Sequence, residues 1–77
     1  MKELDRAMKI RGFKKYLNTG EIIFRNGTVE VKIKEFNVRI IWPTGYEIIK
    51  LCPHEESILA FIEEEMPLRS YRLRRTQ

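Results

Sequence analysis

The sequence predicts an α+β fold with an N-terminal helix, a four-stranded antiparallel meander and a C-terminal helix packed on one face of the sheet. Three observations support this prediction. Asn26-Gly27 separates two apolar runs, which is the strongest short-range indication of a β-hairpin. The second run alternates apolar and charged residues from position 29 to 35, as a strand with one wet face does. A broad apolar stripe between residues 58 and 66 is typical of a helix that covers a sheet.

The first element is a short amphipathic helix over residues 2–11, where apolar side chains recur at a spacing of three to four. Two acidic residues in its first turn complement the helix dipole. The apolar residues of the segment 13–17 fit the same spacing, so either a second turn follows or the helix runs bent to Leu17. Asn18-Thr19-Gly20 is then expected to end it.

The first two strands are predicted at residues 21–25 and 28–35, with Asn26-Gly27 as a two-residue type I′ turn between them. Glycine and asparagine suit this turn because its central residues need a positive φ. This register places Phe24 opposite Val29 and directs both side chains into the core.

Two further strands are predicted at residues 38–42 and 46–51. Phe36-Asn37 lies at the reversal before them, and Pro43-Thr44-Gly45 between them matches a three-residue hairpin loop. That loop sets Trp42 beside Tyr46, and both rings are expected in the core together with Phe24. The last strand has apolar residues on both faces, so we expect both faces to be at least partly covered.

The C-terminal helix is expected to begin near Pro53, because proline suits the first turn, and to end at Pro67. Residues 1–67 then form one α+β domain, and residues 68–77 form an arginine-rich tail. No apolar run is long enough to span a membrane, and charges interrupt the N-terminal residues. We expect an intracellular, cytoplasmic protein that makes no membrane contact.

The charge is segregated along the 77 residues in a way that the net value of +4 conceals. Residues 1–17 carry six basic and two acidic side chains, and residues 68–77 carry four arginines and no acid. Residues 18–67 carry five basic and nine acidic side chains. Two basic ends therefore flank an acidic centre, a layout that can mark a surface for a polyanion or can be neutralised within or between copies of the fold.

The sequence offers little for catalysis or metal binding. Cys52 and His54 are the only thiol and imidazole groups, and a metal site needs three or four converging ligands. A Cys-His nucleophilic pair would lack an orienting third group and an oxyanion hole. We therefore expect a protein that is not an enzyme and that uses no metal, cofactor or small-molecule substrate.

The basic ends predict a module that binds nucleic acid by neutralising phosphates. Tyr71 lies between arginines, a composition that suits contact with a nucleic acid or with an acidic protein surface. The candidate contact residues are Lys9, Arg11, Lys14, Lys15, Arg69, Tyr71, Arg72, Arg74 and Arg75.

An alternative is a small protein-binding regulator or inhibitor, of the accessory type that phages and mobile elements encode, acting through its acidic helix and a sheet edge. Its candidate contact residues are Glu55, Glu56, Glu63, Glu64 and Glu65. A homodimer could also form by pairing acidic helix with basic tail, or edge strand with edge strand.

The order helix, antiparallel strands, helix resembles that of the double-stranded-RNA-binding domain. That family has three strands, and its second helix begins with lysines that grip phosphates. The corresponding stretch here is Pro53-His54-Glu55-Glu56, so the resemblance does not extend to duplex RNA binding through this helix.

Overall fold

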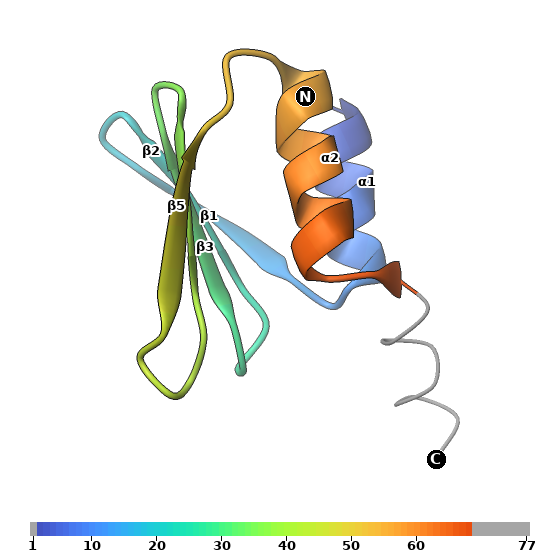
Figure 1. Ribbon diagram of the computed structural model, residues 1–77, viewed down its shortest axis with the longest axis vertical. Coiled ribbons are helices and arrows are strands. Elements are labelled where there is room, and N and C mark those ends of the chain that lie inside the picture. Colours follow the sequence, from blue (N-terminus) through green and yellow to red (C-terminus); the bar gives the residue numbers. More distant parts are fainter. Residues whose placement is uncertain (1, 69–77) are drawn as a thin grey trace.

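The computed structural model describes residues 2–68, which form an α+β domain of two helices and five strands (Figure 1). The elements in chain order are α1 (Lys2–Ile10), β1 (Lys14–Asn18), β2 (Glu21–Arg25), β3 (Glu30–Lys34), β4 (Asn37–Ile41), β5 (Glu47–Leu51) and α2 (Glu55–Glu65). The predicted class and the helix at each end of an antiparallel sheet are confirmed. The sheet has one strand more than predicted.

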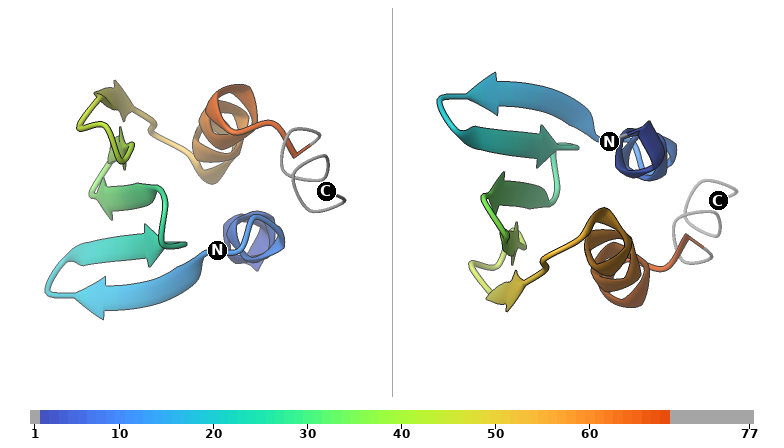
Figure 2. Two further views of the ribbon diagram at one scale, coloured as in Figure 1. Left: turned by 90° about the horizontal axis from the view of Figure 1, so that it is seen from below. Right: turned by 90° about the horizontal axis from the view of Figure 1, so that it is seen from above.

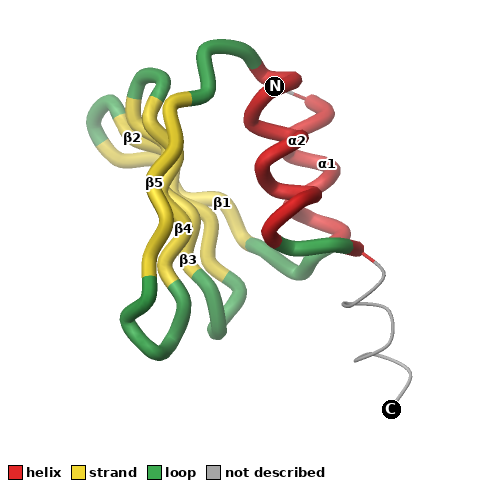
Figure 3. The backbone as a smooth tube through the Cα atoms, in the orientation of Figure 1, coloured by secondary structure: helices red, strands yellow, loops and turns green. Residues whose placement is uncertain are grey.

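The five strands pair in chain order, each antiparallel to the next, so β1 and β5 form the two edges of the sheet. Figure 3 shows the strands, in yellow, beside the two helices, in red. Both helices lie on one face, with α1 toward β1 and β2 and α2 toward β5 (Figure 2). The core fills the space between these two layers, and its fully buried side chains are Leu4, Met8, Phe24, Val31, Val38, Ile40, Cys52 and Ile62. The opposite face of the sheet is uncovered by the described part of the chain.

The expected helical continuation over residues 13–17 is wrong, because this segment is the edge strand β1. Gly12 has a φ of +84°, and backbone hydrogen bonds from Gly12 to Lys9 and from Phe13 to Met8 close α1. Phe13 then enters the core, and β1 pairs with β2 through a tight turn at Thr19 and Gly20. Every residue of β1 is exposed, so the strand lacks the alternating pattern that would identify it.

The hairpin at Asn26 forms, but its predicted register is wrong by two residues. Arg25 pairs with Glu30 and Phe24 with Val31, so the loop has four residues. Asn26 Oδ1 accepts hydrogen bonds from the backbone N–H groups of Thr28, at 2.9 Å, and Val29, at 2.7 Å. This side-chain cap favours the longer loop over the type I′ turn. A shift of two keeps every side chain on its face, so Phe24 is buried as expected.

The hairpin between β4 and β5 contains the predicted Pro43-Thr44-Gly45 turn, and the rings of Trp42 and Tyr46 lie 5.5 Å apart. Tyr46 does not belong to the core, however, since 63% of it is exposed. Trp42 packs partly buried against the core. The expected cover on both faces of the last strand is also wrong, because Ile49 and Leu51 face the open side of the sheet.

The helix α2 begins two residues later than predicted, after His54 as N-cap. The hydroxyl of Ser57 accepts a hydrogen bond from the His54 N–H at 3.0 Å and donates one to the His54 carbonyl at 2.7 Å. Pro53 therefore precedes the helix. Glu55 Oε2 accepts a hydrogen bond from the Leu4 N–H at 3.2 Å, so the carboxylate satisfies a free donor in the first turn of α1.

Candidate nucleic-acid interface

Every second side chain of each of the five strands points to the open face of the sheet. The strand register aligns one row of side chains across the whole sheet, namely Tyr16, Ile23, Lys32, Arg39 and Ile49. The adjacent row consists of Asn18, Glu21, Lys34, Asn37 and Leu51. The two rows bring the basic residues of β3 and β4 together at the centre of the face.

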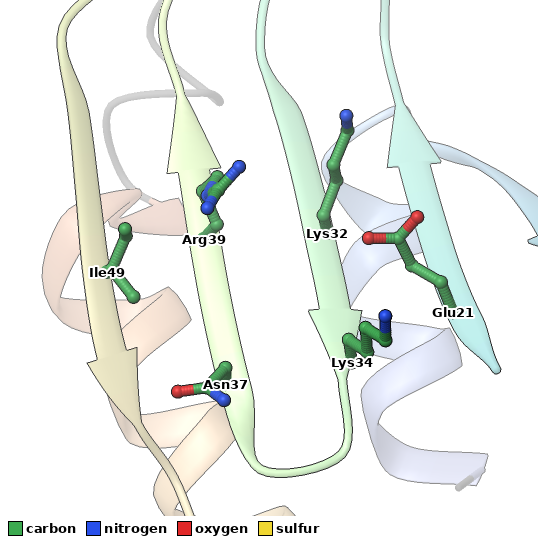
Figure 4. A pocket seen from close by; sticks show the side chains of 6 residues that line it. All are labelled: Glu21, Lys32, Lys34, Asn37, Arg39 and Ile49. Atoms are coloured by element: carbon green, nitrogen blue, oxygen red, sulfur yellow. The ribbon is translucent and has the colours of Figure 1, made fainter.

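A shallow hollow of about 300 Å³ lies at this centre (Figure 4). Three basic side chains line it, Lys32 and Lys34 from β3 and Arg39 from β4, and Asn37 adds an amide. Glu21 lines the β2 side and Ile49 the β5 side. The hollow therefore holds three cations and one carboxylate, a charge balance that favours an anionic ligand.

The ion pairs on the open face leave much of this positive charge available. Arg39 Nε lies 3.9 Å from Glu47, and Lys32 Nζ lies 3.7 Å from Glu30, both close to the limit for an ion pair. Lys34 makes no ion pair within residues 2–68. The donors of these three side chains can thus turn to a ligand at little cost, because long exposed ion pairs contribute little.

Glu30 serves mainly as the partner of Arg25, whose Nε donates a hydrogen bond to Glu30 Oε2. This hydrogen bond lowers the pKa of Glu30; burial opposes it, and the charges of Arg25 and Lys32 add to the lowering. Arg25 also lies over the ring of Tyr16, with its Cζ 5.5 Å from the ring centroid. One edge of the face therefore carries an aromatic ring and a guanidinium stacked together.

The predicted N-terminal cations do not form one surface. Lys9 and Lys14 are exposed, but Lys9 lies on α1 in the helix layer and Lys14 lies on the sheet. Lys15 Nζ forms an ion pair with Asp5 at 3.2 Å. The predicted tail contacts, Arg69, Tyr71, Arg72, Arg74 and Arg75, lie outside the described residues.

Arg11 does not offer its charge to a ligand, which corrects the sequence-based expectation. Only 6% of the residue is exposed, and its Nε donates a hydrogen bond of 2.8 Å to the Met66 carbonyl. A second bond of 3.0 Å joins its guanidinium to the Ala7 carbonyl. Arg11 is therefore a structural residue that satisfies carbonyl groups at the C-terminal ends of both helices.

The acidic residues of α2 are spread around the helix. Glu56, Glu63 and Glu64 are exposed, Glu65 is half-buried, and Glu55 is held by the first turn of α1. Within residues 2–68, none of these five glutamates forms an ion pair. They make the exposed side of α2 acidic, in the layer on the other side of the sheet from the basic hollow.

Cys52 and His54 differ in their exposure to solvent. Cys52 is buried, and burial raises the pKa of its thiol, with a smaller opposing effect from Lys50. His54 is exposed, and both residues border one hollow together with Pro53 and Glu55. Among the residues that the structure describes, no group of three histidine, cysteine or acidic side chains could hold a metal ion.

Comparisons with protein-family models, with curated proteins and with solved structures find no match to this chain. No helix within residues 2–68 is long and apolar enough to cross a membrane. The five-stranded sheet also differs from the three strands of the double-stranded-RNA-binding domain, and α2 begins with two glutamates where that family carries lysines.

Lys32, Lys34 and Arg39 are absent from the set of residues that the sequence singles out. Alternation places Lys32 and Lys34 on the wet face of their strand, but the same face also carries a glutamate, so its charge is of mixed sign. Only the register of β3 with β4 shows that Arg39 lies directly opposite Lys32. Outward-facing basic residues on two neighbouring predicted strands are the sequence feature from which this cluster could have been found.

Proposed function

We propose that this protein is a non-enzymatic, cytoplasmic module that binds single-stranded nucleic acid on the open face of its sheet. One observation carries the proposal: Lys32, Lys34 and Arg39 line a hollow at the centre of a five-stranded sheet face that residues 2–68 leave uncovered. Flat sheet faces suit single strands because unstacked bases can lie against them, whereas a duplex presents mainly its backbone. The basic hollow would hold the phosphates and set the path of the strand.

Tyr16 supplies the second element of such a site. Its ring lies in the same row as Lys32 and Arg39, and it is 46% exposed. A base stacked on an aromatic side chain contributes about 1–3 kcal/mol, whatever its identity. Among residues 2–68, Tyr16 is the one aromatic side chain in the outward rows of this face, and stacking on it does not depend on the identity of the base, so we expect binding with little sequence preference.

Fluorescence anisotropy with a labelled 12-nucleotide single strand tests the proposal. Three phosphate contacts predict a slope of about −2 in a plot of log K against log salt, since each contributes about −0.7 on a single strand. Lys34→Glu should weaken binding at least tenfold at 50 mM salt. The matched control is Lys9→Glu, the same charge change in the helix layer, and it should weaken binding much less. Equal losses in the two variants would refute the proposed surface.

The tail can be examined separately in the full-length chain. Replacing its four arginines by glutamine removes four charges without shortening the protein. If the tail assists, affinity should fall for every sequence alike and the salt slope should become shallower. If the tail variant lost all binding while Lys34→Glu bound as tightly as the wild type, the site would lie on the tail and not on the sheet.

A second candidate function is the binding of a basic protein partner by α2. The observation in its favour is that Glu56, Glu63 and Glu64 are exposed and form no ion pair within residues 2–68. Such a regulator would be recovered from a lysate with a stoichiometric protein, and Glu63→Lys/Glu64→Lys should abolish the recovery. Lys34→Glu, on the other face, should leave it unchanged.

A further inference from the structure

The β5 edge carries backbone groups that no other strand within residues 2–68 satisfies. The Trp42 N–H donates to the Tyr46 carbonyl, and the Cys52 N–H donates to the Phe36 carbonyl. In an antiparallel ladder the hydrogen-bonded positions alternate, so even-numbered residues of β5 point their N–H and C=O groups at β4. Glu47, Ile49 and Leu51 must then point theirs away from the sheet, along its free edge.

The same three residues define a self-complementary register. If two β5 strands pair antiparallel about a two-fold axis at Ile49, Ile49 faces its own copy and Glu47 faces Leu51 of the second copy. In each of these three residue pairs, both residues point their backbone N–H and C=O groups at each other. Each pair exchanges two N–H···O hydrogen bonds, so about six form in total. The pairing also keeps outward side chains on one face, which brings together two Ile49 side chains that are 54% exposed in the single chain.

Charge distinguishes β5 from the other edge of the sheet. β1 carries Lys14 and Lys15 and no acidic residue, so two β1 strands side by side would gather four positive charges. Lysines on an exposed edge are a common protection against such pairing. β5 carries one glutamate and one lysine, and its charges therefore cancel within the strand.

We propose that two copies of this chain associate through β5 to form a continuous ten-stranded sheet with two-fold symmetry. The two open faces then join, and the row of Lys32, Arg39 and Ile49 continues into the row of the second copy in reverse order. Five strand steps of about 4.8 Å place the two Lys32 positions about 24 Å apart. This consequence for ligand binding rests on the proposed function, whereas the dimer itself does not.

Light scattering coupled to size-exclusion chromatography tests the association. The 9.3 kDa chain should elute with twice its own mass at high concentration. Ile49→Pro removes the central outward N–H without adding charge, and proline is tolerated on an edge strand where the N–H faces solvent. This variant should be a monomer, and Ile49→Val, which keeps the N–H and the apolar side chain, should remain a dimer. A wild-type monomer at millimolar concentration overturns the proposal.

Cysteine crosslinking tests the register and does not depend on the folding of the proline variant. Ile49→Cys places two thiols on the axis, within reach of a disulfide, so mild oxidation should give a covalent dimer. Leu51→Cys places its two Cα atoms about 14 Å apart along the strands, too far to bridge. The wild type is the control for the buried Cys52. Equal crosslinking of both variants would contradict the two-fold axis at Ile49. If the wild type were a monomer and still bound nucleic acid, the dimer would be rejected and the proposed function would stand.

Discussion

The side chain of Arg11 joins the two ends of the described fold by a hydrogen bond of 2.8 Å from its Nε to the carbonyl of Met66. The two residues are 55 positions apart, and each follows a helix. Because helix ends leave carbonyl groups without partners, a buried guanidinium at this point satisfies the last turns of α1 and α2 together.

Replacing Arg11 should therefore destabilise the fold more than replacing any exposed cation of α1. Hydrogen bonds that involve a charged group contribute about 1.5–3 kcal/mol, and we expect Arg11→Met to lower the free energy of unfolding by this amount. Urea denaturation measures it. Lys9→Met is the matched control and should change the free energy of unfolding by less than about 0.5 kcal/mol. A small effect at Arg11 would show that water replaces its contacts.

Asn26 should stabilise its hairpin through its side-chain oxygen. Asn26→Ala loses the two hydrogen bonds to the Thr28 and Val29 N–H groups, and we expect a loss of about 1–2 kcal/mol. Asn26→Asp keeps an acceptor at the same place and should retain most of the stability. Thermal unfolding distinguishes the two variants. Equal destabilisation by alanine and aspartate would mean that the acceptor is not what matters.

Cys52 should be unreactive in the folded protein. Its thiol is buried, and burial raises its pKa, so the reactive thiolate is scarce and inaccessible. A thiol reagent such as dithionitrobenzoate should label it slowly at neutral pH and rapidly in urea. Because the pKa of the thiol is higher in the folded protein than in the unfolded chain, the unfolded chain loses its proton first as the pH rises. The free energy of unfolding should therefore decrease above about pH 8.5, the ordinary pKa of a thiol. Rapid labelling without denaturant would contradict the buried position.

Glu30 should titrate below the ordinary range of a glutamate. Its pKa is lowered first by the hydrogen bond from Arg25 and then by the charges of Arg25 and Lys32. The stabilisation is thus present above the unfolded-state pKa of about 4.3 and is lost as the pH falls through the lower folded-state value. We expect at most about 1 kcal/mol, because solvent reaches both side chains of the pair and screens their attraction. Carbon-detected NMR titration should show the pKa rising in Arg25→Ala.

The sequence predicts those elements whose local residue pattern is sufficient to identify them. It misses features that depend on which strands pair and in what register. The alternation of Val31 and Ile33 with lysines identifies β3, and Pro67 marks the end of α2. β1 escapes detection because both its faces are exposed, and because Asn18-Thr19-Gly20 resembles a helix end as well as a hairpin turn. The two-residue error at Asn26 arises because a side-chain cap outweighs the preference of Asn-Gly for a shorter loop.

The candidate site was harder to predict than the fold. A count of charges by segment identifies basic ends, but it cannot show that Arg11 is buried between two helices. The cluster at Lys32, Lys34 and Arg39 depends on which strands are neighbours and on their register, and both follow from the turns. Segment charge is therefore a weaker guide to a surface than the positions that face outward on paired strands.

The chain-order pairing of the five strands has a consequence for how the molecule folds. Each strand meets one that directly precedes or follows it, so the sheet has a low contact order and can grow hairpin by hairpin, which favours rapid folding. Within residues 2–68, α1 and α2 come from the two ends of the described chain and contact each other, and closing that large loop costs entropy. We expect their docking to come late, so that Arg11→Met accelerates unfolding in stopped-flow experiments and hardly slows refolding.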